Sequence, residues 1–272
     1  TGSAVANGFF GIEGIRVVIL YPSNRVSKMQ EKQLTTMGNN ITALEIEGTF
    51  DDCQNMVKKA FLDKNLREKI LLSSANSINI ARLLPQTVYY AWASKKVMEN
   101  HPLVFSVPCG NFGNITGGIF AKRMGFPISK YIAATNSNSI FTKFLHGDQI
   151  KSKKVVKTVS NAMDVSYPSN LERVKLLYDN NINNIKKDII SWSYSSKETK
   201  DCIKEINKTY NYLIDPHTAV GILGINSYQK INKSKNIGIV LSTAHPAKFS
   251  DIIEPIIKEK IIIPNELKKI LK

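Results

Sequence analysis

LVFSVPCGNFGNITGGIFAKRMG, residues 103–125, carries the pattern from which the fold of this 272-residue chain follows. Its first five residues, all apolar except Ser106, have the length and β-branched character of a buried strand, and Pro108 ends that run. A turn punctuated by glycines follows at 109–114. Apolar residues then recur at the spacing of one helical face until Gly125 closes the helix. The stretch therefore predicts a strand, a glycine-rich loop and a helix, in that order.

The junction between this strand and this helix is a candidate phosphate-binding site. Backbone N–H groups and the positive end of the helix dipole point at one spot there, so a dianionic phosphate is held without a lysine. Gly110 and Gly113 allow the backbone to approach the phosphate, and Asn111 and Asn114 add donors or cap the helix. For the loop taken alone, an ordinary turn between a strand and a helix is the alternative.

The rest of the chain alternates short apolar runs with segments of helical periodicity. The strand candidates are 17–20, 41–46, 69–72, 130–134 and 237–241, whereas 180–207 is charged and rich in asparagine and carries little pattern. This alternation indicates an α/β fold with open, mostly parallel sheets flanked by helices. The length suits two domains, and we expect a smaller α/β domain at 1–100 and a larger one at 101–272.

Composition narrows the range of partners. The net charge of +15 invites nucleic-acid binding, but the lysines are spread along the chain and no nucleic-acid motif accompanies them, so we expect no nucleic-acid partner. No apolar run approaches the roughly 18 residues of a membrane-spanning helix, so we expect no membrane partner. Cys53, Cys109 and Cys202 lack any CxxC pairing, which argues against disulfides and a metal site and fits a reducing cytoplasm.

Five segments resemble threonine synthase, a pyridoxal-phosphate enzyme of the tryptophan-synthase-β-like superfamily (fold type II). They are SSANSINIARLLPQTVYY at 73–90, VPCGNFGNITGGIFAKRMGFPISKYIAATNSN at 107–138, SNAMDVSYPSNLERV at 160–174, DPHTAVG at 215–221 and STAHPAKF at 242–249. They follow the order of the family and cover nearly the whole chain. The chain departs from the family loop in two places, with Asn114 for an aspartate and Cys109 for a serine.

The resemblance implies pyridoxal 5'-phosphate as cofactor and the conversion of O-phosphohomoserine and water to threonine and phosphate as the reaction. The implied cofactor-binding residues, in the larger domain, are Gly110, Asn111, Phe112, Gly113, Asn114 and Thr243, the last through a hydroxyl facing the pyridine nitrogen. The implied substrate-binding residues are Thr1, Ser77, Asn79 and Arg82.

Position supports part of the substrate set. Ser77, Asn79 and Arg82 follow the predicted strand at 69–72, and ligands of open α/β sheets bind beyond the carboxyl ends of strands. Arg82 can clamp an anionic group through paired donors, whereas a surface guanidinium is the alternative without the resemblance. In DPHTAVG, Asp215 is a good N-cap, and His217 is either a hydrogen-bonded histidine at the helix start or a group that reaches a ligand.

The first two residues resemble the end of a Ser-Gly-Asp-Thr-Gly loop of the family. The resemblance therefore implies an N-terminal part of the same enzyme, which carries the Schiff-base lysine, as a partner of this chain. No lysine here has a matching context, so we assign no catalytic residue. A remnant that binds phosphate or cofactor without chemistry and a threonine or serine dehydratase-like lyase are the alternatives. The oligomer is either a monomer or a homodimer.

Overall fold

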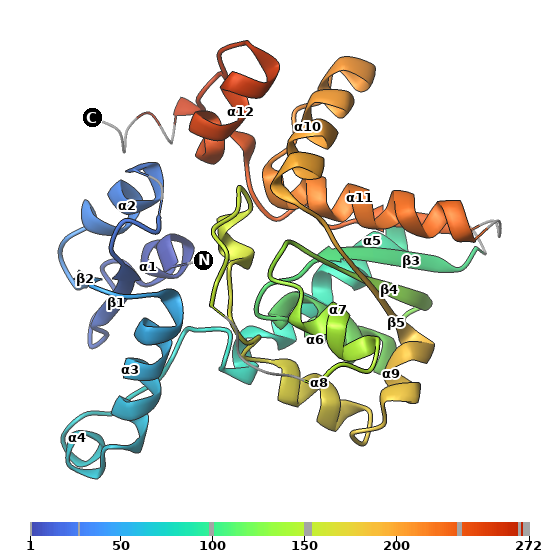
Figure 1. Ribbon diagram of the computed structural model, residues 1–272. Helices are drawn as coiled ribbons and strands as arrows, with labels where there is room; N and C mark the ends of the chain where they lie inside the picture. Colours follow the sequence, from blue (N-terminus) through green and yellow to red (C-terminus); the bar gives the residue numbers. More distant parts are fainter. Residues whose placement is uncertain are drawn as a thin grey trace. The chain divides into compact units, whose positions relative to one another are not determined.

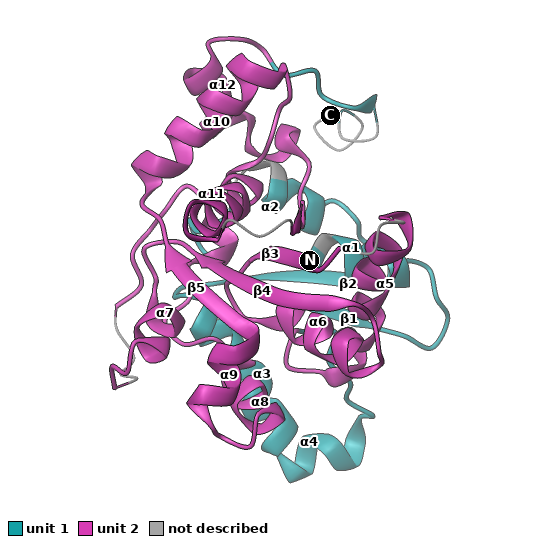
Figure 2. Ribbon diagram, turned by 90° about the vertical axis from the view of Figure 1, so that its right-hand side faces the viewer, with its two compact units in different colours: residues 1–76, 261–272 teal, residues 77–260 magenta. Residues whose placement is uncertain are grey.

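The computed structural model describes residues 2–26, 28–97, 101–149, 154–232, 236–265 and 268, and it contains two compact units (Figure 1, Figure 2). Unit 1 comprises residues 1–76 and 261–272, and unit 2 comprises residues 77–260. Unit 2 starts before the expected boundary at residue 100, because α6 (Gly113–Arg123) packs on the preceding segment: a Cβ at Gly117 would lie 3.0 Å from the Leu83 carbonyl oxygen. The roles assigned to domains 1–100 and 101–272 stay predictions.

Unit 1 is built on a two-stranded parallel sheet. β1 (Val17–Pro22) pairs with β2 (Ile41–Ile46) over their full lengths. The helices of the unit are α1 (Gly2–Phe9), α2 (Lys28–Thr35), α3 (Phe50–Leu62) and α4 (Lys64–Lys69). A capping box between Thr49 and Asp52 fixes the start of α3, since each side chain accepts the backbone N–H of the other residue.

The strand expected at 69–72 is not formed. The Asp63 side chain accepts the Leu66 N–H and starts α4, which runs through Lys69 and ends at Ile70. Leu71 is fully exposed, so the apolar run lacks the burial on which the prediction depended. A local helix-capping interaction therefore outweighs the strand pattern here.

Unit 2 contains a four-stranded parallel sheet in the order β5-β4-β3-β6. Its strands are β3 (Leu103–Pro108), β4 (Ile128–Thr135), β5 (Ile189–Ser193) and β6 (Ile237–Val240). β3 lies inside the sheet and is buried on both faces, as is typical of a central parallel strand. The predicted α/β fold with parallel sheets is confirmed in both units.

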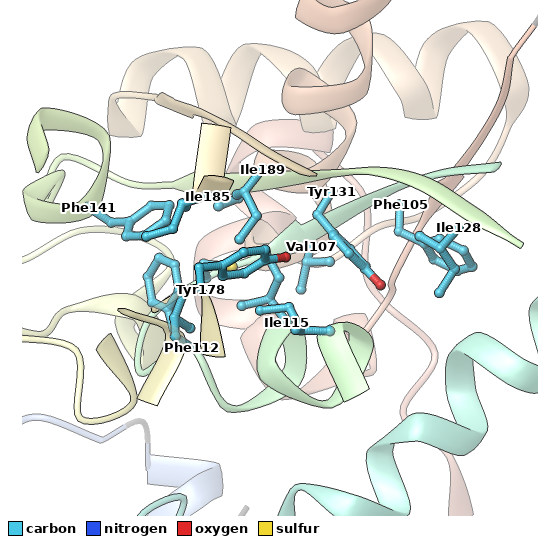
Figure 3. Close-up of a cluster of buried hydrophobic side chains, with 14 of the residues drawn as sticks. Phe105, Val107, Phe112, Ile115, Ile128, Tyr131, Phe141, Tyr178, Ile185 and Ile189 are labelled. Carbon is cyan, nitrogen blue, oxygen red and sulfur yellow. The ribbon is translucent and has the colours of Figure 1, made fainter. Parts of the chain in front are cut away.

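Helices cover both faces of this sheet (Figure 1). The larger hydrophobic cluster joins one sheet face to α6 through side chains such as Phe105, Tyr131 and Ile115 (Figure 3). The other face, which includes Val104 and Ile132, packs on α11 (Pro216–Ile231). The remaining helices of unit 2 are α5 (Thr87–Lys96), α7 (Ile140–Leu145), α8 (Leu171–Leu177), α9 (Ile182–Asp188), α10 (Ser196–Tyr210) and α12 (Ser250–Ile257).

The described residues of unit 2 also form four 3-10 turns: η1 (Ile80–Arg82), η2 (Leu84–Gln86), η3 (Asn161–Met163) and η4 (Pro246–Phe249). Among the helices of the described residues, none has the length and apolar character that crossing a membrane requires.

Candidate functional site

The glycine-rich loop lies where the sequence predicts it, between the carboxyl end of β3 and the start of α6. Phe112 occupies the N-cap position with a left-handed backbone, φ +63°, and the helix begins at Gly113. Within the described residues, the backbone N–H groups of residues 110–114 have no acceptor. A row of unsatisfied N–H donors at the positive end of an eleven-residue helix is suited to an anionic oxygen group such as phosphate.

The segment 160–170 holds this loop in place. Gly110 packs against η3 so closely that a Cβ would lie 2.9 Å from both the Ala162 carbonyl oxygen and the Met163 Cα. The Asn111 carbonyl accepts a bond from the Asn170 side chain at 2.9 Å, and the Asn111 side-chain oxygen accepts the Ser169 N–H at 3.1 Å. The loop conformation is therefore set by a segment about 50 residues further along the chain.

The two loop asparagines use their side-chain oxygens for this scaffolding. Asn114 Oδ1 accepts the hydroxyl of the fully buried Tyr90 at 2.7 Å, and Asn111 Oδ1 binds Ser169 as described. Neither side chain caps α6, because Phe112 fills the N-cap position without a side-chain bond. The expectation that an asparagine caps the helix is therefore wrong, whereas donation by the asparagine side-chain amides to a ligand stays a prediction.

Cys109, which the resemblance sets opposite a serine, is part of the core. Its N–H donates to the Ala134 carbonyl at 2.8 Å, and its side chain is only 4% exposed. Burial raises the pKa of the thiol far above its usual range, so the side chain stays a neutral thiol. All three cysteines are free and buried.

Thr243 lies beyond the carboxyl end of β6, the strand that neighbours β3. The Leu241 N–H donates to the Ser106 carbonyl at 3.0 Å, which continues the β3–β6 pairing past Val240. Because parallel strands end at the same edge of a sheet, this places Thr243 at the same edge as the glycine-rich loop. The Thr243 side chain is exposed, and its hydroxyl makes no hydrogen bond in the described part of the chain.

Ser77 is beside the loop as well, although the strand expected before it is absent. A Cβ at Gly113 would lie 3.6 Å from the Ser77 Cβ, and the Ser77 hydroxyl is 3.3 Å from that of Ser169. Asn170 also donates to the Ser77 carbonyl at 3.0 Å. The Ser77 position therefore depends on contacts with the loop scaffold and not on a strand end.

Asn79 and Arg82 belong to the next turn. The Asn79 side-chain oxygen accepts the Ala81 N–H and caps η1, and the half-buried Arg82 offers its carbonyl to Gln86 at 2.7 Å. Thr1, the remaining predicted substrate residue, lies outside the described residues.

A buried pair that the sequence left undecided sits behind the loop. Asp215 is fully buried at the start of α11 and accepts both the backbone N–H of His217, at 2.9 Å, and its Nδ1–H, at 2.8 Å. His217 Nε2 accepts the Ala162 N–H at 3.2 Å. Of the two alternatives, the structure supports the hydrogen-bonded histidine at the helix start.

The charge of Asp215 is stabilised in place. Burial opposes ionisation of the carboxyl group, but the hydrogen bonds from His217 and Thr218 outweigh it and lower the pKa of Asp215. Pro216 and the N-cap pattern indicated the helix start, but no sequence signal pointed to the Ala162 N–H as the partner of His217 Nε2.

Sequence reasoning also missed a polar cluster after β4. The Asn136 side chain donates to Thr158 and Asp164, both at 2.8 Å, and Asp164 also accepts the Thr158 N–H and hydroxyl. Burial raises the pKa of Asp164 in spite of these bonds. The cluster anchors the chain just before η3. Within the described residues, no group of three or more histidine, cysteine or acidic side chains is placed to hold a metal ion.

Comparison with family models gives two matches. The model described as "Pyridoxal-phosphate dependent enzyme" covers residues 4–243, which includes the loop and Thr243. The model described as "Threonine synthase, C-terminal" covers residues 218–272.

Curated relatives and solved structures agree with these matches. The chain is 45% identical over 269 residues to threonine synthase of Buchnera aphidicola subsp. Acyrthosiphon pisum and 42% identical to that of Escherichia coli, covering 98% of this chain and 62% of each relative. The crystal structure of the Escherichia coli threonine synthase superposes with a TM-score of 0.93, covering 99% of this chain and 62% of that one. The chain thus spans less than two thirds of the length of these relatives. The predicted resemblance to threonine synthase and the predicted fold are confirmed.

Proposed function

Because the chain belongs to the family of pyridoxal-phosphate-dependent enzymes, we propose that its loop 110–114 holds the phosphate of pyridoxal 5'-phosphate in a threonine synthase. The proposed reaction converts O-phosphohomoserine and water to threonine and phosphate. The observation that carries the proposal is the row of N–H groups at 110–114, which has no acceptor within the described chain. Five donors suit a dianionic group that is bound without a lysine.

Thr243 fits the opposite end of the same cofactor. Its hydroxyl is exposed, lacks a partner in the described chain and follows the strand next to β3. A hydroxyl facing the pyridine nitrogen leaves that nitrogen nominally neutral, whereas a carboxylate keeps it protonated. When bound, pyridoxal phosphate supplies an electron sink for chemistry next to the substrate amine. The chain itself binds and orients the cofactor.

Ser77, Asn79 and Arg82 are the proposed contacts of the substrate. Ser77 lies beside Gly113, and the turn capped by Asn79 presents Arg82 a few residues further on. A guanidinium donates two parallel hydrogen bonds to a phosphate, which suits the leaving group of O-phosphohomoserine. Two phosphates are thereby held in one site by backbone donors and by an arginine.

The complete activity also needs a base and a covalent anchor for the cofactor. In the proposal, a lysine on an N-terminal part of the same enzyme supplies both, in line with relatives that are longer than this chain. We place the protein in the cytoplasm, where the three free cysteines stay reduced. Similarity to serine racemase of Dictyostelium discoideum, at 16% identity and a TM-score of 0.64, supports the fold alone and does not favour the lyase alternative.

The test combines a binding titration with covalent trapping. The protein is titrated with pyridoxal phosphate and, as a matched control, with pyridoxal, which lacks the phosphate. We expect binding that depends on the phosphate, and no borohydride-trapped adduct on any specific lysine until the lysine-bearing segment is added. Phosphate release from O-phosphohomoserine is then expected with both parts present. Equal affinity for the two ligands would refute the loop as the phosphate site, and binding without turnover by the complete enzyme would favour the inactive remnant.

A further inference from the structure

We propose that His217 is a positioning residue that couples the phosphate loop to the strand end carrying Thr243, and that it thereby sets the affinity of the site for the phosphate group. The inference rests on the proposed function. It concerns a side chain that lies behind the site and touches neither the loop donors nor Thr243 directly.

The surroundings of His217 fix its tautomer. The side chain is 5% exposed, and its two ring nitrogens face opposite kinds of partner. The Asp215 carboxylate accepts from Nδ1, and the Ala162 N–H donates to Nε2. Only the neutral ring with its proton on Nδ1 satisfies both bonds at once. His217 is therefore a rigid bridge between the start of α11 and the turn η3.

At its Nε2 end, His217 bonds to the turn η3, on which the loop 110–114 packs. Ala162 and Met163 are the residues against which Gly110 packs, with 2.9 Å between a Cβ built at Gly110 and their backbone atoms. Segment 160–170 also holds Asn111 through Ser169 and Asn170. Loss of the bond from the Ala162 N–H leaves a backbone donor unpaired and releases the turn under Gly110.

The other end leads to the pyridine side of the proposed cofactor. The Asp215 carboxylate accepts the Thr218 hydroxyl, and the Thr218 hydroxyl is 3.0 Å from that of Ser242, the residue before Thr243. The Phe249 ring packs on the imidazole with 5.1 Å between ring centroids. His217 therefore joins the two chain segments that the proposed function assigns to opposite ends of one ligand.

Two substitutions separate the halves of the bridge. In His217→Asn the amide nitrogen takes the place of Nδ1 and keeps the bond to Asp215, but the shorter side chain does not reach Ala162. In His217→Gln the side chain extends to the Nε2 position and offers an acceptor to the Ala162 N–H. We therefore expect the asparagine variant to bind pyridoxal phosphate about tenfold more weakly, the effect of one lost hydrogen bond, and the glutamine variant to recover much of that affinity.

The matched control is Tyr194→Phe. The Tyr194 hydroxyl is buried and bonds to the Leu223 carbonyl and to Ser227 on the same helix α11, so its removal also deletes bonds to that helix but leaves η3 untouched. We expect a loss of thermal stability comparable to that of His217→Asn with unchanged affinity for pyridoxal phosphate.

The readouts are the affinities for pyridoxal phosphate and for pyridoxal, and the shift of the Gly110 and Gly113 amide signals by NMR on titration with inorganic phosphate. We expect His217→Asn to lower the affinity for pyridoxal phosphate and to reduce the amide shifts caused by inorganic phosphate. The affinity for pyridoxal is expected to stay constant. Equal weakening toward pyridoxal phosphate and pyridoxal, or no rescue by glutamine, would overturn the positioning role. Failure of the unsubstituted protein to prefer pyridoxal phosphate over pyridoxal would instead refute the proposed function.

Discussion

At the scale of single residues, a substitution of Thr243 is expected to affect the bound cofactor without affecting the stability of the fold. Its hydroxyl is exposed and has no partner in the described chain, so its removal costs the fold little. We expect Thr243→Val to change the free energy of unfolding by less than about 0.5 kcal/mol. We also expect the variant to alter the absorbance spectrum of bound pyridoxal phosphate, because the partner of the pyridine nitrogen is lost, while Thr243→Ser keeps the spectrum. An unchanged spectrum in the valine variant would exclude Thr243 from the cofactor site.

For Asp215, in contrast to Thr243, we expect a substitution to change the free energy of unfolding, because the charge of Asp215 stabilises the fold. Its pKa in the folded chain lies below the ordinary 3.8. The ionised form therefore stabilises the fold at all pH values above the unfolded-state pKa, and this contribution is lost as the pH falls through the folded-state pKa. Asp215→Asn still caps α11 but weakens the bonds from His217 and Thr218, so we expect a loss of about 1–3 kcal/mol near pH 7.

Urea unfolding of the two proteins at several pH values measures this difference. We expect the gap between Asp215 and its asparagine variant to be constant from about pH 5 to about pH 7 and to narrow toward about pH 3. A gap that widens on acidification would mean that burial, and not the bonds from His217, dominates the pKa of Asp215.

At the scale of elements, the phosphate loop depends on close backbone packing. In Gly110→Ala the new Cβ meets two backbone atoms at 2.9 Å, Ala162 O and Met163 Cα, so the loop or η3 has to shift. We expect a destabilisation of about 1–3 kcal/mol. We also expect a loss of at least about tenfold in affinity for pyridoxal phosphate, since misplaced N–H donors no longer converge on the phosphate.

The matched control for this variant is Gly8→Ala in α1, where a Cβ would meet nothing within 4 Å. Alanine has the higher helix propensity, so this change is expected to leave stability unchanged or to raise it by up to about 1 kcal/mol. Retention of full phosphate affinity by Gly110→Ala would show that the loop tolerates the shift.

The elements also show what local pattern determines and where it fails. The loop, its flanking strand and helix, and β4 and β6 were all predicted from apolar runs and helical periodicity, and each is present. β5 lies in the segment 180–207, which carries little pattern. It has only five residues and pairs with β4 at the sheet edge, and so short a strand leaves little periodicity in the sequence. A capping box of Ser195 and Glu198 marks the start of α10 in the same segment and was a usable signal.

The scaffold of the site was not predictable in the same way. The hydrogen bond between His217 and Ala162 joins residues that are 55 positions apart in the sequence, and the bond between Asn111 and Ser169 joins residues 58 positions apart. No periodicity encodes such single long-range bonds, since each depends on how separate elements pack in three dimensions. Sequence therefore indicates which backbone is the candidate phosphate site, and the structure adds the side chains that hold this backbone in place.

At the scale of the whole molecule, the charge of +15 predicts that salt stabilises the fold, and the choice of anion separates this general effect from binding at the loop. A dispersed lysine surface repels itself, so screening by NaCl between about 20 and about 300 mM should raise the unfolding temperature. Sodium sulfate at equal ionic strength should raise it further, partly by general exclusion from the protein surface and partly because a tetrahedral dianion binds the loop 110–114. Gly110→Ala should keep the first part of the sulfate increment and lose the second. Differential scanning fluorimetry of both proteins in the two salts measures these parts, and an equal sulfate increment in both would show that the loop holds no dianion.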